Sequence, residues 1–529
     1  MDRRSVLRGG LFGAGGLLAT GATACAPAPW SPDDLGPFDC GVASGVHSDT
    51  AVVLWTRFAP GALAATTVRW TVTADDTSAR VVSTGTAVAS PDRDGCVKVL
   101  AEGLAPGRTY WYRFEVDGVQ SPPGRTRTLP AADDDVSQVS FAVASCQQFA
   151  AGYYPAWRAI ANADLDAVVF LGDYIYESTS RTGVRSDDGR VANDLASYRG
   201  KYKLYRSDPD LRAAHQMHPF AIVWDDHEFV NNCNRVEIAE QPERAAAAYR
   251  AWFEYQPVWP IGEGADALRI HRRHRWGRLV DLTLLDTRQH RDAPIDGPAI
   301  GSTLDPPLRQ VHSPERTLLG PSQRDWFLDG FDEAQDDGVQ WKLVGNQVMF
   351  TPLRLIDLDT PVMRALRPDV ISGAGVYGNL DDWSGFLGER DLVTARLADH
   401  RISGVGFLTG DVHMFFQSQV AADMDDETSP IVAQEFVCGS VSSVAAAVLG
   451  PLIGDVEAIV KGLSPGFRHA DMIRRGFGRV TCTKERTEVR FHTVDALTPT
   501  PSVADPTHRG YVAFDWRPTH QVTMSNVRV

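Results

Sequence analysis

Short apolar runs recur along the second part of the chain, and each is followed directly by polar residues. Ala167–Leu171, Ala221–Trp224 and Val405–Leu408 consist of apolar residues with no polar alternation. Runs of this length are typical of strands that are buried on both faces of a sheet. Similar runs predict further buried strands at Phe141–Ala144, Leu279–Leu285 and Trp341–Val344.

Helical stretches alternate with these strands. Pro155–Ala163 and the Ala- and Glu-rich segment Glu243–Tyr255 are predicted helices, and Gly478–Thr483 with Thr487–Thr493 forms a predicted hairpin. Alternating strands and helices are typical of α/β and α+β domains. We therefore expect one such domain over residues 137–525.

Residues 36–130 follow a different pattern, in which apolar and polar side chains alternate. From Val68 to Thr73 and from Tyr110 to Val116, every second side chain is apolar, as in a strand with one buried face. Leu104–Tyr110 resembles the corner before a late strand of a fibronectin-type domain, where a tyrosine hydroxyl ties the turn. A small fibronectin-like β-sandwich is therefore predicted in front of the α/β domain.

The first 24 residues resemble a twin-arginine export signal. Arg3-Arg4 precedes a Gly-rich, weakly apolar stretch that is too short for a good membrane span, and Ala22–Ala24 offers a cleavage site. We therefore expect the protein to be exported by the twin-arginine machinery and to be secreted, periplasmic or associated with the cell wall. Release and lipid anchoring through Cys25 both stay open.

Composition and charge narrow the classes of partner. The chain is 43% hydrophobic and 22% charged, as in an ordinary globular protein. Its formal charge of −15 argues against a protein that coats nucleic acid, so no nucleic-acid partner is predicted, and we expect a monomer. The spacing of the cysteines does not match a zinc finger. Cys40 and Cys96 are candidates for a disulfide, with the connectivity left open.

Three segments that follow apolar runs are rich in Asp, Glu and His. They are Gly172–Glu177, Trp224–Glu228 and Gly410–His413. Strand ends in a rigid sheet can bring polar side chains to one point, but unpaired charges beside a core are unfavourable. A bound metal ion would neutralise these charges, so the pattern predicts a metal site.

Four further motifs are Ser145–Gln147, Leu285–Gln289, Gly345–Gln347 and Trp383–Phe386. Together with the three segments above, they resemble the PhoD alkaline phosphatase/phosphodiesterase family of the wider metallophosphatases. The resemblance covers nearly the whole mature chain, and it implies two sheets flanked by helices, with iron and calcium at the site. The chain departs from the family at Trp383–Phe386 and at Gln289-His290, which bears on substrate preference.

The chemistry of the donor atoms divides the candidate ligands into two groups. Thiolate, phenolate and imidazole suit ferric iron, whereas carboxylate and amide oxygens suit calcium. Asp173 can bridge the two ions with its carboxylate. The first group is Cys146, Tyr176 and His413, and the second is Asp226, Asn346 and Asp411.

These residues predict in-line attack on phosphorus by a metal-held hydroxide. His227 is predicted to stabilise or protonate the leaving oxygen. Arg288 is predicted to hold a phosphate oxygen, with a structural ion pair to Asp286 as the alternative. Glu177 and Glu228 are expected to support the ligands rather than bind metal, and Asp225 is a secondary ligand candidate.

The predicted function is an exported, metal-dependent hydrolase of phosphate monoesters and diesters, of the alkaline phosphatase type. One alternative is a phospholipase D-like phosphodiesterase acting on phospholipid, which exposed aromatic side chains near Trp383 and Phe386 would favour. Another is a non-catalytic surface adhesion protein, against which the many charges at the site argue. The chain has no P-loop pattern and no Gly-x-Ser-x-Gly elbow, so neither a nucleoside-triphosphate hydrolase nor a serine hydrolase has support.

Overall fold

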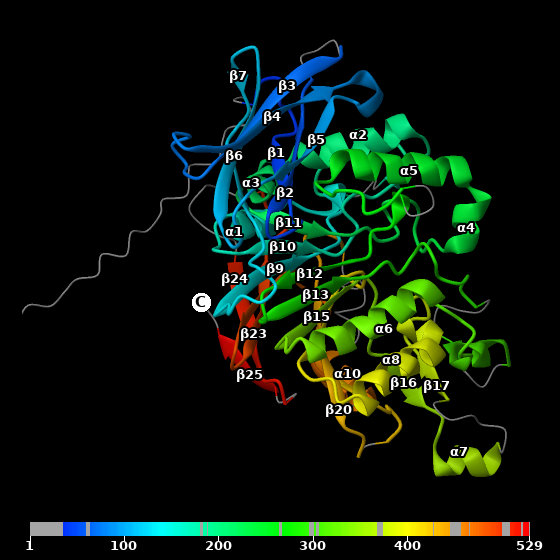
Figure 1. The fold of residues 1–529 in the computed structure, drawn as a ribbon. Helices are drawn as coiled ribbons and strands as arrows, with labels where there is room; N and C mark the ends of the chain where they lie inside the picture. The colour runs from blue at the N-terminus through cyan, green and yellow to red at the C-terminus, as the bar shows by residue number, and fades with distance from the viewer. Residues whose placement is uncertain are drawn as a thin grey trace, which may run out of the picture.

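The computed structural model describes residues 35–59, 64–179, 183–187, 189–263, 267–295, 301–302, 306–367, 374–426, 428–444, 456–464, 466–499, 508–519 and 522–527. Within these ranges the chain forms sheets of ten, seven, five and three strands, together with helices (Figure 1). The mixed α/β class predicted from the sequence is therefore confirmed. The export signal predicted at residues 1–24 lies outside the described residues.

The ten-stranded sheet combines strands from the N-terminal, middle and C-terminal parts of the chain. Its strands β9, β10, β11 and β1 are parallel neighbours, which places the ends of three apolar runs side by side. In order, its strands are β25 (Val522–Val527), β24 (His508–Trp516), β23 (Thr487–Val494), β22 (Arg475–Thr483), β9 (Gln138–Ala144), β10 (Ala167–Phe170), β11 (Pro219–Ile222), β1 (Val42–Gly45), β2 (Ala51–Arg57) and β5 (Cys96–Glu102).

The seven-stranded sheet packs against the ten-stranded sheet through aromatic side chains. The rings of Trp341 and Trp516 lie 4.7 Å apart, and those of Phe436 and Phe514 lie 5.9 Å apart. In order, its strands are β12 (Arg272–Trp276), β13 (Val280–Leu284), β15 (Trp341–Asn346), β18 (Val405–Thr409), β20 (Ile431–Cys438), β19 (Phe415–Ala421) and β21 (Phe467–Asp471).

Side chains alternate between two cores along the strands of the seven-stranded sheet. On β15, Leu343 joins the core shared with the ten-stranded sheet, and Val344 joins a second core with Phe331 and Val393 from helices α6 and α8. Helices therefore cover the face of this sheet that points away from the ten-stranded sheet. In the part of the chain that the structure describes, the α-helices, on this face and elsewhere, are α1 (Pro155–Ala161), α2 (Leu195–Arg206), α3 (Pro209–Met217), α4 (Arg235–Glu240), α5 (Pro242–Tyr255), α6 (Pro321–Asp336), α7 (Pro361–Leu366), α8 (Leu387–Asp399) and α10 (Val456–Leu463).

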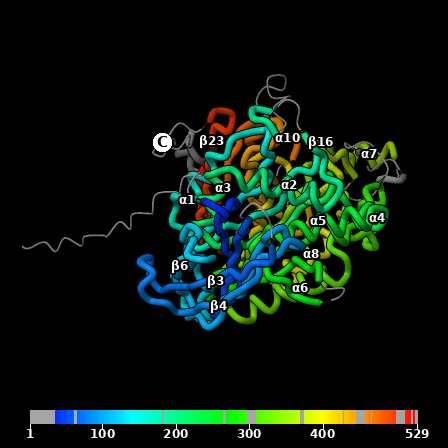
Figure 2. Tube along the Cα trace, turned by 90° about the horizontal axis from the view of Figure 1, so that it is seen from above, coloured from blue at the N-terminus to red at the C-terminus, as the bar shows by residue number. Residues whose placement is uncertain are grey.

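The N-terminal strands share a sheet with the rest of the chain. Strands β1, β2 and β5 extend the ten-stranded sheet, because Ser44 pairs with Pro219 and Gly45 with Phe220. A five-stranded sheet packs on them and lies to one side of α2 and α5 when seen from above (Figure 2). Its strands are β4 (Val81–Ala89), β3 (Thr66–Thr73), β6 (Thr109–Val116), β7 (Val119–Gln120) and β8 (Gly124–Arg127).

The tyrosine corner expected from the sequence is present. The backbone N–H of Ala105 donates to the Tyr110 hydroxyl over 2.8 Å. Cys40 and Cys96, candidates for a disulfide, are free and buried thiols in this structure. Among the described residues, no helix is both long and apolar enough to cross a membrane.

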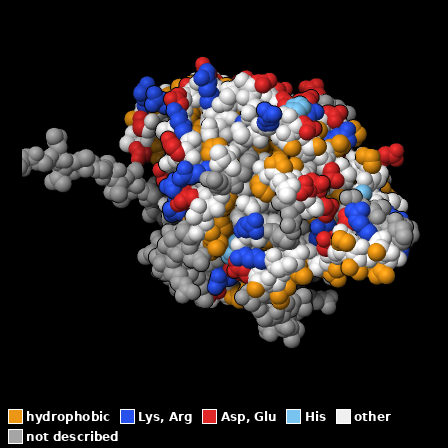
Figure 3. Space-filling model, turned by 90° about the horizontal axis from the view of Figure 1, so that it is seen from below, with side chains coloured by type: hydrophobic (Ala, Val, Ile, Leu, Met, Phe, Trp, Pro, Cys, Tyr) orange, Lys and Arg blue, Asp and Glu red, His pale blue; other side chains and the backbone are white. Residues whose placement is uncertain are grey.

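The outer surface carries mixed charges. On the underside, Lys and Arg side chains are interspersed with Asp and Glu and with hydrophobic groups (Figure 3).

The smallest sheet lies at the periphery and joins β14 (Gly301–Ser302), β17 (Gly375–Tyr377) and β16 (Arg354–Asp357).

Candidate metal centre

The predicted ligands follow strands whose carboxyl ends meet between the two large sheets. Cys146 and Asp173 follow the parallel neighbours β9 and β10, and Asp411 follows β18 of the other sheet. Backbone hydrogen bonds join these loops: the Cys146 N–H donates to the Gly172 carbonyl over 3.1 Å. The sheets therefore deliver these side chains from both sides to one place.

Four predicted ligands have a left-handed backbone, which is uncommon for residues other than glycine. The φ angles are 57° at Cys146, 58° at Asp173, 59° at Asp411 and 58° at His413. Such conformations cost free energy and cluster at functional sites. Asp411 and His413 are two positions apart, and their left-handed turns send them to different groups of side chains.

The first group combines sulfur, carboxylate and imidazole. Ligand atoms of Cys146, Asp173 and His413 all lie within 4.8 Å of one another. The Tyr176 hydroxyl donates to Asp173 Oδ2 over 2.9 Å and lies 3.1 Å from Nε2 of His413. The other ring nitrogen, Nδ1 of His413, lies 2.9 Å from the Val444 carbonyl, which fixes the proton on Nδ1 and leaves Nε2 for a metal.

Burial controls the protonation of this group. It raises the pKa of the Cys146 thiol and of the Tyr176 phenol well above their ordinary values, and the charge of Asp173 adds to both shifts. Burial lowers the pKa of His413 to about 4. Without a cation, all three side chains are therefore neutral at pH 7, and a metal ion would have to displace the thiol and phenol protons.

Two further groups share Asp226. One joins Asp173, Asp226 and His227, and the other joins Asp225, Asp226 and Asp411, each with ligand atoms within 4.8 Å of one another. Asp173 and Asp226 thus connect all three groups into one continuous site. Burial tends to lower the pKa of His227, but the charges of Asp226 and Asp173 outweigh it and raise the pKa well above its ordinary value.

Glu177 orients the imidazole of His227. Its Oε2 lies 2.7 Å from Nδ1 of His227, and the Tyr176 ring packs against the His227 ring with centroids 4.1 Å apart. These contacts fix the ring plane and place the other nitrogen, Nε2, on the opposite side of the ring. The sequence prediction that Glu177 supports a site residue agrees with this geometry.

Arg288 is completely buried and binds carboxylates. Its guanidinium donates to Asp225 over 2.5 Å, to Asp381 over 2.8 Å and to Asp411 over 3.2 Å. The alternative ion pair with Asp286 is absent, since Asp286 Oδ1 instead accepts the backbone N–H of Arg288 over 3.1 Å. Arg288 therefore provides fixed positive charge at the site, and its contact with phosphate remains a prediction.

Asn346, Trp383 and Phe386 are also buried. Nε1 of Trp383 donates to Oδ1 of Asn346 over 3.2 Å, and neither Trp383 nor Phe386 has exposed surface. The exposed aromatic groove that would favour a phospholipase is therefore not formed by these two residues. They pack in the core beside α8 instead.

Glu228 joins the loops that follow β10 and β11. Its carboxylate accepts backbone N–H groups from Asp173, Tyr174 and Asp225 at 3.0, 2.8 and 3.0 Å. Gly172 permits this close approach, because its φ is 102° and an added Cβ would lie 2.4 Å from Asp225. Glu228 is thus a supporting residue, as the sequence predicts.

Some contributors to the site are not apparent from sequence motifs. Asp381 accepts from both Arg288 and Arg291, over 2.8 and 2.7 Å. The segment Gly439–Val444 contacts the first group of ligands through Ser443 and Val444. A serine-rich turn is a common surface pattern, so only the packing shows this contact.

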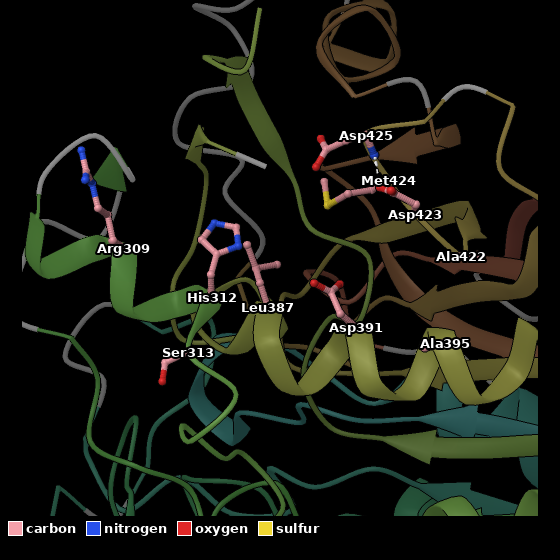
Figure 4. A pocket seen from close by; sticks show the side chains of 10 residues that line it. All are labelled: Arg309, His312, Ser313, Leu387, Asp391, Ala395, Ala422, Asp423, Met424 and Asp425. Carbon is pink, nitrogen blue, oxygen red and sulfur yellow. Dashed lines mark hydrogen bonds between the residues drawn. The ribbon is translucent and has the colours of Figure 1, made fainter. Parts of the chain in front are cut away.

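A separate hollow of about 660 Å³ lies beside α8. Figure 4 shows His312 on one side of it and Asp423 and Asp425 on the other. None of the residues that line it belongs to the three groups of candidate ligands. The hollow is therefore not the centre of the chemistry described above.

The fold and the clustered side chains define an α/β protein with a candidate metal centre. A model of the family PhoD-like phosphatase matches residues 141–491, and a model of the PhoD-like phosphatase N-terminal domain matches residues 24–130. The chain belongs to the PhoD-like phosphatase family. The family resemblance stated from seven motifs is thereby confirmed.

Similar proteins agree with this assignment. The chain is 36% identical over 430 residues to alkaline phosphatase D of Bacillus subtilis (strain 168), covering 77% of this chain and 70% of that protein. A solved structure described as the structure of PhoD is similar with a TM-score of 0.81 and 30% identity, covering 93% of both chains. The protein is therefore an enzyme, a hydrolase of the phosphatase type.

Proposed function

We propose that this protein is an exported enzyme that hydrolyses phosphate monoesters and diesters, with ferric iron and calcium at the candidate metal centre. The observation that carries the proposal is the meeting of Cys146, Asp173 and His413 within 4.8 Å, with the Tyr176 hydroxyl against Asp173 and His413. Sulfur, phenolate and imidazole donors together favour ferric iron over calcium.

The carboxylates beside this group fit a hard cation. Asp225, Asp226 and Asp411 lie around the guanidinium of Arg288, so three carboxyl groups face this one fixed positive charge. Oδ2 of Asp225 is buried and has no hydrogen-bond partner among the described residues. Oxygen donors of this kind suit calcium. Bound cations would supply positive charge at phosphorus and a water of lowered pKa.

The remaining roles belong to side chains of the chain itself. His227, oriented by Glu177, would place a proton at the leaving oxygen. Arg288 would hold Asp225 and Asp411 in position and add positive charge beside the reacting phosphate. Glu228 would keep the two ligand loops together through three backbone N–H groups.

Export by the twin-arginine route is part of the proposal. It is supported by Arg3-Arg4, the Gly-rich stretch and the Ala22–Ala24 cleavage site. Twin-arginine export carries folded proteins, which suits an enzyme that must acquire its metals before it leaves. A monomer acting on small phosphate esters, without nucleic acid, completes the proposal.

The proposal is tested by release of inorganic phosphate from an aryl phosphate. Enzyme stripped with a chelator should be inactive, and ferric iron with calcium should restore activity where either metal alone should not. Full recovery with zinc alone would contradict the assignment of the metals. Activity that survives complete removal of metals would contradict the whole mechanism.

A further inference from the structure

The segment Gly439–Val444, which follows β20, supports the sulfur, phenolate and imidazole ligands together. Its Val441 N–H donates to the Ser145 carbonyl over 3.0 Å. Its Ser443 hydroxyl reaches the Tyr176 oxygen, and its Val444 carbonyl lies 2.9 Å from Nδ1 of His413. One short segment outside every recognised motif therefore contacts the surroundings of all three ligands.

Ser443 has no exposed surface, and its hydroxyl is held by three contacts. The Gln148 backbone N–H donates to it over 3.0 Å, while the Tyr176 oxygen lies 2.7 Å away and the Cys146 carbonyl 2.9 Å away. A serine hydroxyl has one proton to donate. That proton can go either to the Tyr176 oxygen or to the Cys146 carbonyl.

The Cys146 carbonyl does not depend on this proton. It also accepts the backbone N–H groups of Ser442 over 3.4 Å and of Ser443 over 3.2 Å. The Tyr176 oxygen, in contrast, becomes a strong acceptor when the side chain serves as an anionic ligand. The hydroxyl proton is then worth most on the phenolate, and Gln148 holds the serine oxygen where it can donate.

From this geometry we infer that Ser443 is a positioning residue that donates a hydrogen bond to the Tyr176 phenolate and tunes the bond between the phenolate and iron. The inference rests on the proposed iron site and adds to it a residue that no motif marks. A hydrogen bond to a phenolate stabilises its lone pairs. It therefore raises the energy needed to transfer an electron from the phenolate to ferric iron.

The test is the visible absorption of the purified, iron-loaded enzyme. Ser443→Ala should move the phenolate-to-iron band to longer wavelength and weaken iron retention against a chelator by about 10- to 100-fold, as is typical for loss of such a supporting partner. Ser442→Ala is the matched control, because its hydroxyl donates over 2.9 Å to the Gln148 carbonyl in the same segment and does not contact Tyr176.

Several outcomes separate the inference from the proposed function. A band in the parent enzyme that Ser443→Ala leaves unmoved would overturn the inference and leave the iron site standing. An equal shift in Ser442→Ala would also overturn it, since the effect would then belong to the whole segment. A parent enzyme with no iron and no band would overturn the proposed iron site itself.

Discussion

The hydroxyl of Tyr176 lies 3.1 Å from Nε2 of His413, although 237 positions separate the two residues in the chain. Tyr176 follows β10 of the ten-stranded sheet, and His413 follows β18 of the seven-stranded sheet. The contact therefore spans the two sheets. A metal bound by both side chains would connect the sheets, so metal binding and packing of the sheets should stabilise each other.

The first prediction concerns the identity of the metals. Purified enzyme should contain iron and calcium and should be coloured by charge transfer from the Tyr176 phenolate to ferric iron. Tyr176→Phe should lose the colour, because phenylalanine has no oxygen to bind the metal. Elemental analysis and visible spectra measure both effects. Stoichiometric zinc without iron would contradict the prediction.

The second prediction separates a ligand from a proton donor. Asp226→Ala should lose calcium and activity, because Asp226 belongs to two of the three groups of candidate ligands. His227→Ala should keep the metals and lower kcat by about 10²–10⁴, the usual cost of losing a general acid. Metal content and kcat should be measured together on both variants.

The control for the second prediction is the leaving group. A substrate whose leaving group needs no proton should be affected less by His227→Ala than a substrate with a poor leaving group. If His227→Ala keeps full turnover on the poor leaving group, His227 does not carry the proton. Glu177→Gln, which changes the partner of Nδ1, should show a weaker form of the same pattern.

The strands that lead into the site are predictable because they are apolar on both faces. β10 (Ala167–Phe170) and β18 (Val405–Thr409) fall within one residue of the runs identified in the sequence. The clustering of the polar residues after these strands is also predictable, because charges that follow a buried strand require a partner.

Features set by tertiary packing are not predictable in this way. Trp383 looks like a candidate for a substrate groove, yet it is buried against Phe350 with ring centroids 4.9 Å apart. The contact between Ser443 and Tyr176 joins two loops from different sheets, and no local pattern marks it. Pairing of β1 with β11 likewise depends on a contact between distant segments.

The third prediction concerns the stability of the metal-free protein. Burial raises the pKa of Asp382 to about 7 and that of Glu228 to about 8. These carboxyl groups keep their protons in the folded protein at pH values where the unfolded chain has lost them. The contribution of these two groups to the free energy of unfolding should therefore be largest below their ordinary pKa values of 3.8 and 4.5, and should fall as pH rises towards 8.

Urea unfolding of chelator-treated protein at several pH values measures this effect. Each carboxyl should lower the free energy of unfolding by about 1.4 kcal/mol per pH unit between its two pKa values. Asp382→Asn should reduce the pH dependence, because an amide has no proton to lose. If Asp382→Asn leaves the pH dependence between about pH 5 and pH 8 unchanged, the burial argument for Asp382 is wrong.

The fourth prediction concerns export. Replacing Arg3-Arg4 by Lys-Lys should leave the precursor in the cytoplasm, because the twin-arginine pair is the feature by which the leader resembles such a signal. Fractionation of cells that express each form measures the outcome. Unchanged export of the variant would mean that another pathway carries the protein.

The last prediction concerns substrate range. Positive charge fixed at phosphorus stabilises the transition state of either type of ester, so the enzyme should hydrolyse both monoesters and diesters, with an alkaline optimum. Monoesters carry more negative charge and should gain most from the cations. Diesters need room for a second substituent. Trp383 and Phe386 are buried and cannot supply a lipid groove, whereas His290 is exposed.

We therefore expect phosphatidylcholine to be a poor substrate. The measurement is kcat/KM for an aryl phosphate, a bis-aryl phosphate and a phosphatidylcholine dispersion, each with calcium present. The two aryl esters should be cleaved at useful rates, and the lipid should be cleaved far more slowly, because Trp383 and Phe386 are packed inside the core and cannot contact an acyl chain. If only the lipid is cleaved efficiently, the proposed substrates are wrong and the enzyme is a phospholipase.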